Sequence, residues 1–328
     1  MKKTVSVAPM MDCTDRHDRF FLRLISKNVM LYTEMIATKT AIHGDRKKIL
    51  SYSPEEKPLA LQVGGSDKKE LAEVAKIAED MGYDEINLNL GCPSKKVQKN
   101  KFGACLMKEP KLVFDCVNEM VNSCNIPVTA KTRIGFDDTE NFDYLNKFIL
   151  KMREAGCSTF IIHARKAILK GLTPKQNLNI PKLNYEMVYK IKKENPELEI
   201  IINGGISKIS EIKKHLKICN GVMLGRAIYQ NPYFLTEIEK NIYNNSQILT
   251  RETIAKQILE YLEEEVKLGT KVNHVMRHTV GLYHGQPGSK NWKRYLSENM
   301  MARDSDFMKA KHIMTIIQNN EKTNQIKI

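Results

Sequence analysis

A single cysteine, Cys92, stands between Gly91 and Pro93 at the end of the apolar run INLNL. No second cysteine lies at CxxC spacing, which disfavours a metal site because zinc sites usually show paired ligands. A thiol near its usual pKa of about 8.5 is largely protonated at neutral pH and can donate a proton. A free cysteine can also be a small buried hydrophobe, so the elements around Cys92 must decide its role.

The composition is typical of a globular protein with excess positive charge. The 328 residues are 42% hydrophobic, enough for one large domain with or without a small one. A net charge of +14 predicts a polyanionic partner, unless the lysine excess reflects genome composition. Seven cysteines without CxxC spacing predict reduced thiols. With no hydrophobic leader and no 18-residue apolar run, we expect a cytoplasmic protein that does not enter a membrane.

Eight short β-rich runs alternate with longer amphipathic stretches in the first two thirds of the chain. This order and length predict an α/β fold, a (β/α)8 TIM barrel. A doubly wound sheet is the alternative, but it would carry a glycine fingerprint, and neither GxGxxG nor GxxxxGK[ST] occurs. The expected strands are residues 4–10, 29–35, 59–65, 85–91, 127–133, 159–165, 199–205 and 221–226.

Polar side chains gather where consecutive expected strands end. Barrel enzymes place their chemistry at these C-terminal ends, although a single polar residue there is commonly a cap. Seven strand ends in succession predict one shared site. The residues are Glu34, Gln62, Asn87, Asn89 with Cys92, Lys131 with Arg133, His163 with Arg165, Asn203, and Arg226.

The last two expected strand ends predict a phosphate site. Gly204, Gly205 and Gly225 let backbone N–H groups approach a phosphate closely, and Arg226 can add a charge-assisted fork. Amide and cationic donors on the other strands could surround a flat, electron-accepting ring, which predicts flavin mononucleotide (FMN). These ring-facing residues are Gln62, Lys131 and His163.

Seven motifs in order resemble the tRNA-dihydrouridine synthases over about residues 5–300: VAPMMDCTD, LALQVGG, INLNLGCPS, KTRIG, HAR, INGGI and MLGRA. The segments HARKAILKGLTPKQN and HGQPGSKNWKRYLSE are similar to the A-type bacterial branch, which modifies U20 and U20a of the tRNA D-loop. The resemblance implies FMN as cofactor, NADPH or NADH as reductant and tRNA as partner. We also expect no metal and a monomer.

The resemblance also implies residue roles. Cys92 becomes the proton donor, with Asn89 beside the target base and Arg133 supporting either the base or the flavin. The flavin would be held by Pro9, Met10, Met11, Gln62, Lys131, His163, Asn203, Gly204, Gly205, Gly225 and Arg226. The tRNA would contact Asn89, Arg133, Arg165, Lys175, Lys290, Lys293 and Arg294.

The chemistry of uracil reduction gives Cys92 a role of its own. Hydride from flavin N5 goes to C6, and the opposite face of the base needs an acid that protonates C5. This role requires the protonated thiol, so the lowered pKa of a nucleophilic cysteine is not wanted.

Helical patterns replace the alternation after residue 235, at 251–269, 273–285, 289–301 and 307–318. They predict a tRNA-binding domain at residues 245–328, following a catalytic barrel at residues 1–240. His274 and His278 have i, i+4 spacing but no third ligand, so we expect core or RNA-facing histidines. The ring of Trp292 is expected in the core. Residues 96–103 are expected to form a mobile basic loop over the site.

Two other functions remain open at this point. An FMN barrel acting on a free pyrimidine, similar to dihydroorotate dehydrogenase, would share the flavin site but would not need a basic helical domain. An RNA-binding barrel without catalysis is the non-enzymatic alternative, and the intact Cys92 and flavin positions argue against it.

Overall fold

The computed structural model describes residues 4–300, 305–306 and 308–309. By internal packing the chain divides into two compact units. The first comprises Met1–Thr14 and Val29–Gly225, and the second comprises Asp15–Asn28 and Arg226–Ile328. The second unit therefore takes a segment from between the first two strands and joins it to the C-terminal part of the chain.

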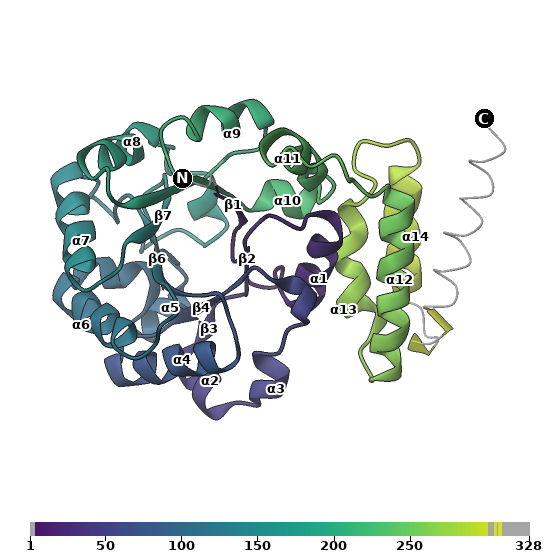
Figure 1. Cartoon of the computed structure of the whole chain (residues 1–328), viewed down its shortest axis with the longest axis horizontal. Helices are drawn as coiled ribbons and strands as arrows, with labels where there is room; N and C mark the ends of the chain where they lie inside the picture. Colours follow the sequence, from purple (N-terminus) through teal and green to yellow (C-terminus); the bar gives the residue numbers. More distant parts are fainter. Residues whose placement is uncertain (1–3, 301–304, 307, 310–328) are drawn as a thin grey trace. The chain divides into compact units, whose positions relative to one another are not determined.

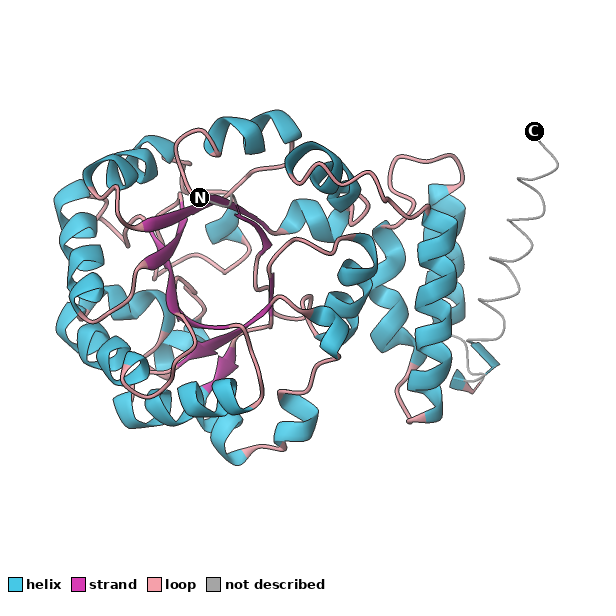
Figure 2. Ribbon diagram, viewed as in Figure 1, coloured by secondary structure: helices cyan, strands magenta, loops and turns pink. Residues whose placement is uncertain are grey.

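The first unit is a parallel β-barrel, which confirms the predicted fold class. Figures 1 and 2 show its strands as a ring inside a layer of helices. All the strand pairs are parallel, in the order β1-β9-β8-β7-β6-β5-β4-β2, and a parallel bridge between Ser6 and Met30 joins β1 to the start of β2. The strands are β1 (Thr4–Val7), β2 (Leu31–Tyr32), β4 (Leu59–Gly64), β5 (Glu85–Leu90), β6 (Val128–Arg133), β7 (Thr159–His163), β8 (Glu199–Asn203) and β9 (Gly221–Leu224).

One short strand was not expected from the sequence. β3 (Ile36–Ala37) pairs with Val63 and Gly64 at the end of β4. The predicted run at 29–35 is correspondingly interrupted, since β2 is only two residues long.

Some helices of the first unit begin at a residue whose side chain caps them. The carboxylate of Asp67 accepts hydrogen bonds from the backbone N–H groups of Lys69 and Glu70, and Asn141 does the same at its helix. Each capped helix then turns its apolar face to the strands. The helices are α2 (Thr38–His43), α3 (Arg46–Ile49), α4 (Lys68–Asp80), α5 (Lys95–Lys99), α6 (Pro110–Val121), α7 (Phe142–Glu154), α8 (Tyr185–Glu194) and α9 (Ile209–His215).

Inside the barrel, apolar side chains form one cluster. Buried Ala8, Tyr32, Ala60, Ile161, Ile201 and Met223 make up this core, with Met10 and Met30 packed against it. Side chains alternate between the two faces of a strand, so residues two apart face the same side. Gln62, His163 and Asn203 each lie two residues after a core residue of the same strand. Asn87 pairs in register with Gln62, and Lys131 pairs in register with the core residue Ile161. The strand period thus brings these polar groups inside the barrel.

The second unit is helical in the residues described. Its longest helix, α12, buries Ile254, Ile258 and Leu262 on one face. Within the described residues, no helix is long and apolar enough to cross a membrane. The helices are α1 (Arg16–Ile25), α10 (Arg226–Gln230), α11 (Phe234–Ile242), α12 (Arg251–Lys267), α13 (Val272–Met276) and α14 (Ser289–Met300).

One expected helix differs from the structure, and another lies almost entirely outside the described residues. The run 273–285 is not one helix, because α13 ends at Met276 and a 3-10 turn follows at Arg277–Gly281. The expected helix at 307–318 lies, apart from residues 308–309, outside the described residues.

Candidate active site

Cys92 lies on a turn whose backbone groups form hydrogen bonds with three other segments of the barrel. The side-chain oxygen of Asn89 accepts hydrogen bonds from the N–H groups of Gly91 (3.1 Å) and Cys92 (3.0 Å). Arg133 Nε donates to the Gly91 carbonyl at 2.8 Å. The Cys92 carbonyl accepts from the N–H of Ala104 at 2.9 Å. With these four bonds, β5, β6 and the segment after α5 together fix the position of the thiol.

The approach of residues 103–104 to Cys92 requires glycine at 103. Gly103 has a φ of +76°, and a Cβ there would lie 2.6 Å from the Cys92 carbonyl oxygen and 2.5 Å from a methyl of Val97. Both distances are shorter than real Cβ contacts, so a larger residue would push this segment away from Cys92.

The segment at 96–103 was expected to be a loop, and that expectation is wrong in its first half. Lys95–Lys99 forms the short helix α5. Gln98 Nε2 donates to the carbonyls of Pro93 (2.8 Å) and Leu169 (2.9 Å). This segment therefore supports the Cys92 turn. The sequence signal that could have shown this was the pair Gln98 and Gly103 within an otherwise lysine-rich run.

The surroundings of Cys92 keep its thiol protonated. Burial raises the pKa of Cys92, and this effect exceeds the opposing influence of a hydrogen bond with the Ser94 backbone and the charges of Arg133 and Lys131. The half-buried Cys105 also has a raised pKa, again mainly through burial. The site thus provides a neutral S–H, the form that can give up a proton.

Lys131 is an inward-facing amine with one side-chain partner. Its Nζ lies 3.2 Å from Oδ1 of Asn203, whose amide in turn donates to the Met223 carbonyl at 2.8 Å. Burial, assisted by the charge of Arg133, lowers the pKa of Lys131 to about 7. A buried amine with such a pKa gains its proton readily when an anion binds beside it.

The ends of β7 and β8 come close together through two glycines. Gly204 (φ +123°) is so near His163 that a Cβ there would lie 2.7 Å from the imidazole ring. Gly205 also has a positive φ, of +70°, and Tyr185 donates to the Gly204 carbonyl at 2.6 Å. His163 and Asn203 are paired in register, so the side chains predicted at these two strand ends are brought together.

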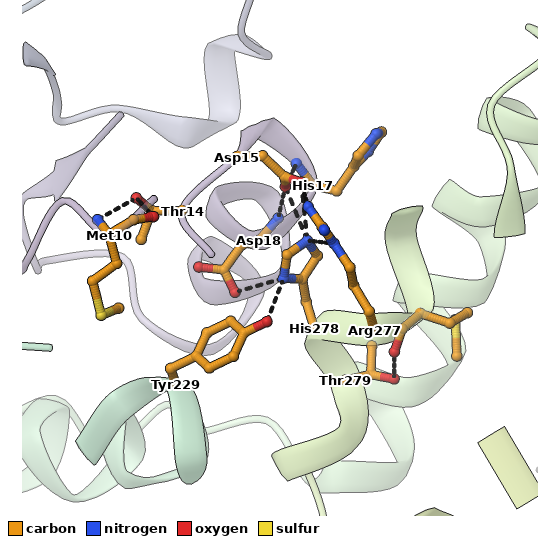
Figure 3. Close-up of polar contacts among 10 residues, drawn as sticks. Met10, Thr14, Asp15, His17, Asp18, Tyr229, Arg277, His278 and Thr279 are labelled. Atoms are coloured by element: carbon orange, nitrogen blue, oxygen red, sulfur yellow. Dashed lines mark hydrogen bonds and ion pairs between the residues drawn. The ribbon is translucent and has the colours of Figure 1, made fainter. Parts of the chain in front are cut away.

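The loop after β1 is braced by Thr14, as Figure 3 shows. The N–H of Met10 donates to Thr14 Oγ1 at 3.0 Å, and the Met10 carbonyl accepts from the N–H of Thr14 at 3.0 Å. Pro9 and Met10 are half-buried, whereas Met11 is 54% exposed. Gly225 lies beside Met10, since a Cβ at 225 would be 3.3 Å from the Met10 sulfur. Arg226 follows as the first residue of α10.

Gln62 and Asn89 are buried and hydrogen-bonded to each other. Gln62 is only 1% exposed, and Asn89 Nδ2 donates to its side-chain oxygen at 2.8 Å. Gln62 Nε2 donates to Asn87 Oδ1 at 2.8 Å. Both polar atoms of the Gln62 side chain therefore already have partners inside the barrel.

Two predicted substrate arginines have structural partners. The buried guanidinium of Arg133 donates to the Gly91, Lys166 and Asn177 carbonyls, at 2.8, 3.0 and 3.3 Å. Arg165 donates to the carbonyls of Asn179 and Pro181. These bonds fold residues 165–181 back on the barrel. In the same segment Lys175 is exposed.

The remaining predicted RNA contacts lie on α14 in the second unit. Lys290, Lys293 and Arg294 are exposed, and Arg294 forms a loose ion pair with Glu298 at 3.9 Å. The Trp292 ring is buried, as expected, and its Nε1 donates to the Thr279 carbonyl at 3.1 Å. The three cationic side chains thus lie on the exposed side of α14, next to the buried and hydrogen-bonded Trp292 ring.

The two spaced histidines do not act as a pair. His274 is exposed, whereas His278 is buried and its Nε2 lies 3.1 Å from Oδ2 of Asp15, the residue that caps α1 (Figure 3). Arg277 contacts the same carboxylate at 2.5 Å. Burial alone would raise the pKa of Asp15, but these partners together hold it well below its usual range. His278 is thus a core histidine of the second unit.

Comparison with known proteins shows the family of this chain. The family model described as "Dihydrouridine synthase (Dus)" matches residues 6–320. A tRNA-dihydrouridine(20/20a) synthase of Vibrio cholerae is 50% identical over 90% of this chain and 90% of its own length. Proteins of the same name from Shewanella oneidensis (91% of this chain, 89% of its own) and Synechocystis (90% and 89%) are each 49% identical. The chain belongs to the dihydrouridine synthase family.

Proposed function

We propose that this protein is a tRNA-dihydrouridine(20/20a) synthase that reduces the C5=C6 bond of uridine in the D-loop. The observation that carries the proposal is the Gly91–Cys92–Pro93 turn, which holds a neutral thiol at the C-terminal end of the barrel strands. Relatives of nearly equal length and about 49% identity bear that name.

The residues at the ends of β6, β7 and β8 fit a flavin mononucleotide. Lys131 offers an amine that could become charged beside an anionic ring edge, and Gly204 and Gly205, both with positive φ, would offer backbone N–H groups to a phosphate. A bound FMN supplies hydride for C6 of uracil. Pro9, Met10, Met11, Gln62, His163, Asn203, Gly225 and Arg226 complete the proposed flavin site.

The protein's own contribution to the reaction is a proton. Cys92 Sγ–H protonates C5 of the base, and the thiolate regains a proton from water after the product leaves. The raised pKa of Cys92 suits this role, because an acid must be protonated before it can act. The four bonds to the turn reduce the movement needed to reach the reacting geometry.

The tRNA would be held by positive charge. Exposed Lys175 on the barrel and exposed Lys290, Lys293 and Arg294 on α14 suit phosphate contacts. Residues 1–240 would act as the catalytic domain and residues 245–328 as the tRNA-binding domain. The protein would act as a monomer in the cytoplasm, with NADPH or NADH as reductant. One uridine must leave its stack to enter the barrel.

The test is to map dihydrouridine in tRNA from a strain that lacks its own synthases and expresses this chain. Product at positions 20 and 20a supports the proposal, and a Cys92→Ala chain is the matched control. Product only at 16 or 17 would contradict the position assignment. Turnover of a free pyrimidine without tRNA would instead favour a nucleobase oxidoreductase.

A further inference from the structure

A chain of side-chain hydrogen bonds runs through the barrel from the Cys92 turn to the opposite end of β5. Asn89 Nδ2 donates to Gln62 Oε1 (2.8 Å), and Gln62 Nε2 donates to Asn87 Oδ1 (2.8 Å). Asn87 Nδ2 then donates to Thr129 Oγ1 (2.7 Å), and Thr129 donates to Glu85 Oε1 (2.5 Å). Four consecutive bonds thus connect Asn89, which caps the Cys92 turn, to the first residue of β5.

The direction of the chain is fixed at the Cys92 end. Asn89 Oδ1 accepts from two backbone N–H groups, which can only donate. Its amide nitrogen must therefore face Gln62, and the same constraint passes through Gln62 and Asn87 to Thr129. Each donor points away from Cys92, so this series of hydrogen bonds needs an acceptor at its far end.

Glu85 supplies that acceptor. Its Oε1 accepts from both Thr129 and the Tyr32 hydroxyl, the latter at 2.8 Å. The carboxyl group is at the N-terminal end of β5, at the far end of that strand from Cys92, where barrel enzymes do not carry their catalytic groups. It is thus too remote to touch a substrate at the mouth.

Burial makes each link hard to replace by water. Asn87 is 0% exposed, Gln62 1%, Thr129 2% and Asn89 8%. A buried amide that loses its partner stays unsatisfied unless it turns to a new one. Breaking one bond in the middle therefore frees the amides on either side to rotate, up to the cap on Cys92.

We propose that Asn87, Thr129 and Glu85 are positioning residues, which orient Gln62 and Asn89 and through Asn89 hold the Cys92 thiol in place. The effect on catalysis rests on the proposed function, whereas the effect on the thiol does not. The series of hydrogen bonds needs an acceptor oxygen at position 85, so a neutral amide there is sufficient to keep it intact.

The test uses matched variants of two buried threonines on β6. Thr129→Val removes the hydroxyl that links Asn87 to Glu85, and Thr129→Ser retains it. Thr132→Val is the control, because Thr132 is equally buried but donates only to the Arg133 carbonyl. At the chain's end, Glu85→Gln keeps an acceptor oxygen and Glu85→Leu removes it.

Two measurements separate positioning from general damage. The first is the alkylation rate of Cys92 relative to Cys105 with iodoacetamide, followed by mass spectrometry on the purified, flavin-containing protein. The second is the single-turnover reduction of tRNA at saturating tRNA.

For Thr129→Val and Glu85→Leu we expect Cys92 to be alkylated about 10-fold faster, equivalent to about 1.4 kcal/mol of lost restraint. Alkylation of Cys105 should stay unchanged, and tRNA reduction at saturating tRNA should slow by about 10- to 100-fold. Thr129→Ser, Glu85→Gln and Thr132→Val should match the parent.

Three results would overturn the proposal: unchanged Cys92 alkylation in Thr129→Val, equal losses in Thr129→Val and Thr132→Val, or a Glu85→Gln protein that behaves as Glu85→Leu does. If the parent forms no dihydrouridine but the alkylation pattern appears as expected, the proposed function fails while the positioning of the thiol stands.

Discussion

Replacing Gly103 with alanine should damage the Cys92 turn more than it damages the fold. Two costs combine at this residue. A φ of +76° is unfavourable for alanine by about 1–2 kcal/mol. The added methyl would also lie 2.6 Å from the Cys92 carbonyl oxygen, and overpacking of this kind costs about 1–3 kcal/mol.

A second glycine separates these two costs. Gly171 has a φ of +86°, but nothing lies within 4 Å of the position of its Cβ. Gly171→Ala therefore carries the conformational cost alone, and we expect about 1–2 kcal/mol of destabilisation. Gly103→Ala should lose about 2–5 kcal/mol, and the difference measures the close approach to Cys92.

The assay is urea unfolding of both variants, combined with single-turnover reduction of tRNA. The relaxation open to Gly103→Ala is movement of residues 103–104 away from the turn, which breaks the bond from Ala104 to the Cys92 carbonyl. Activity should therefore fall by about 10²-fold, whereas Gly171→Ala should stay near the parent. Equal unfolding free energies, or full activity in Gly103→Ala, would refute the role given to this contact.

Three other predictions follow from the site. Cys92→Ala should keep its FMN and its reduction by NADPH but slow the reduction of tRNA by about 10²- to 10⁴-fold in stopped-flow absorbance, with Cys105→Ala as the control. Burial and the charge of Glu199 raise the pKa of Glu85 to about 7 against opposing bonds from Thr129 and Tyr32, so the folded state retains a proton that the unfolded state loses. This contribution to stability is complete at low pH and is lost as pH rises through about 7. In urea unfolding, the free energy of unfolding of Glu85→Gln should therefore gain up to about 3 kcal/mol relative to the parent between pH 4.5 and 8. Parallel pH profiles of the two proteins would contradict this. Lys293→Gln should weaken tRNA binding and reduce the slope of log K against log salt by about 0.7–0.9, whereas an unchanged slope would show that this lysine contacts no phosphate.

The strands could be predicted from the sequence because a buried parallel strand leaves a continuous apolar run with turn residues at its end. β5 illustrates this, since INLNL is followed directly by the Gly–Cys–Pro turn. The same rule located Lys131, His163 and Asn203, whose positions follow from strand parity and register.

Contacts between distant segments could not be predicted in this way. Ala104 binds the Cys92 turn through its backbone N–H, a group that every residue except proline carries. The side-chain amide of Gln98 reaches the Leu169 carbonyl, 71 residues away, only in the folded chain. Glu85 carries no such signal because it begins a strand, whereas barrel sites are expected at the C-terminal ends of strands. Arg133 was expected to touch a ligand, but its donors reach carbonyls that become close only after folding.

The membership of α1 in the second unit has a consequence for the order in which the protein can fold. Arg16 of α1 donates to Glu265 of α12 at 2.8 Å across 249 residues, and Asp15 meets His278 across 263. During synthesis α1 leaves the ribosome near the beginning, whereas its charged partners appear only after all the barrel strands have been made. Until then these ionic groups remain hydrated, so during synthesis α1 can complete its contacts only after residues 265 and 278 have been made.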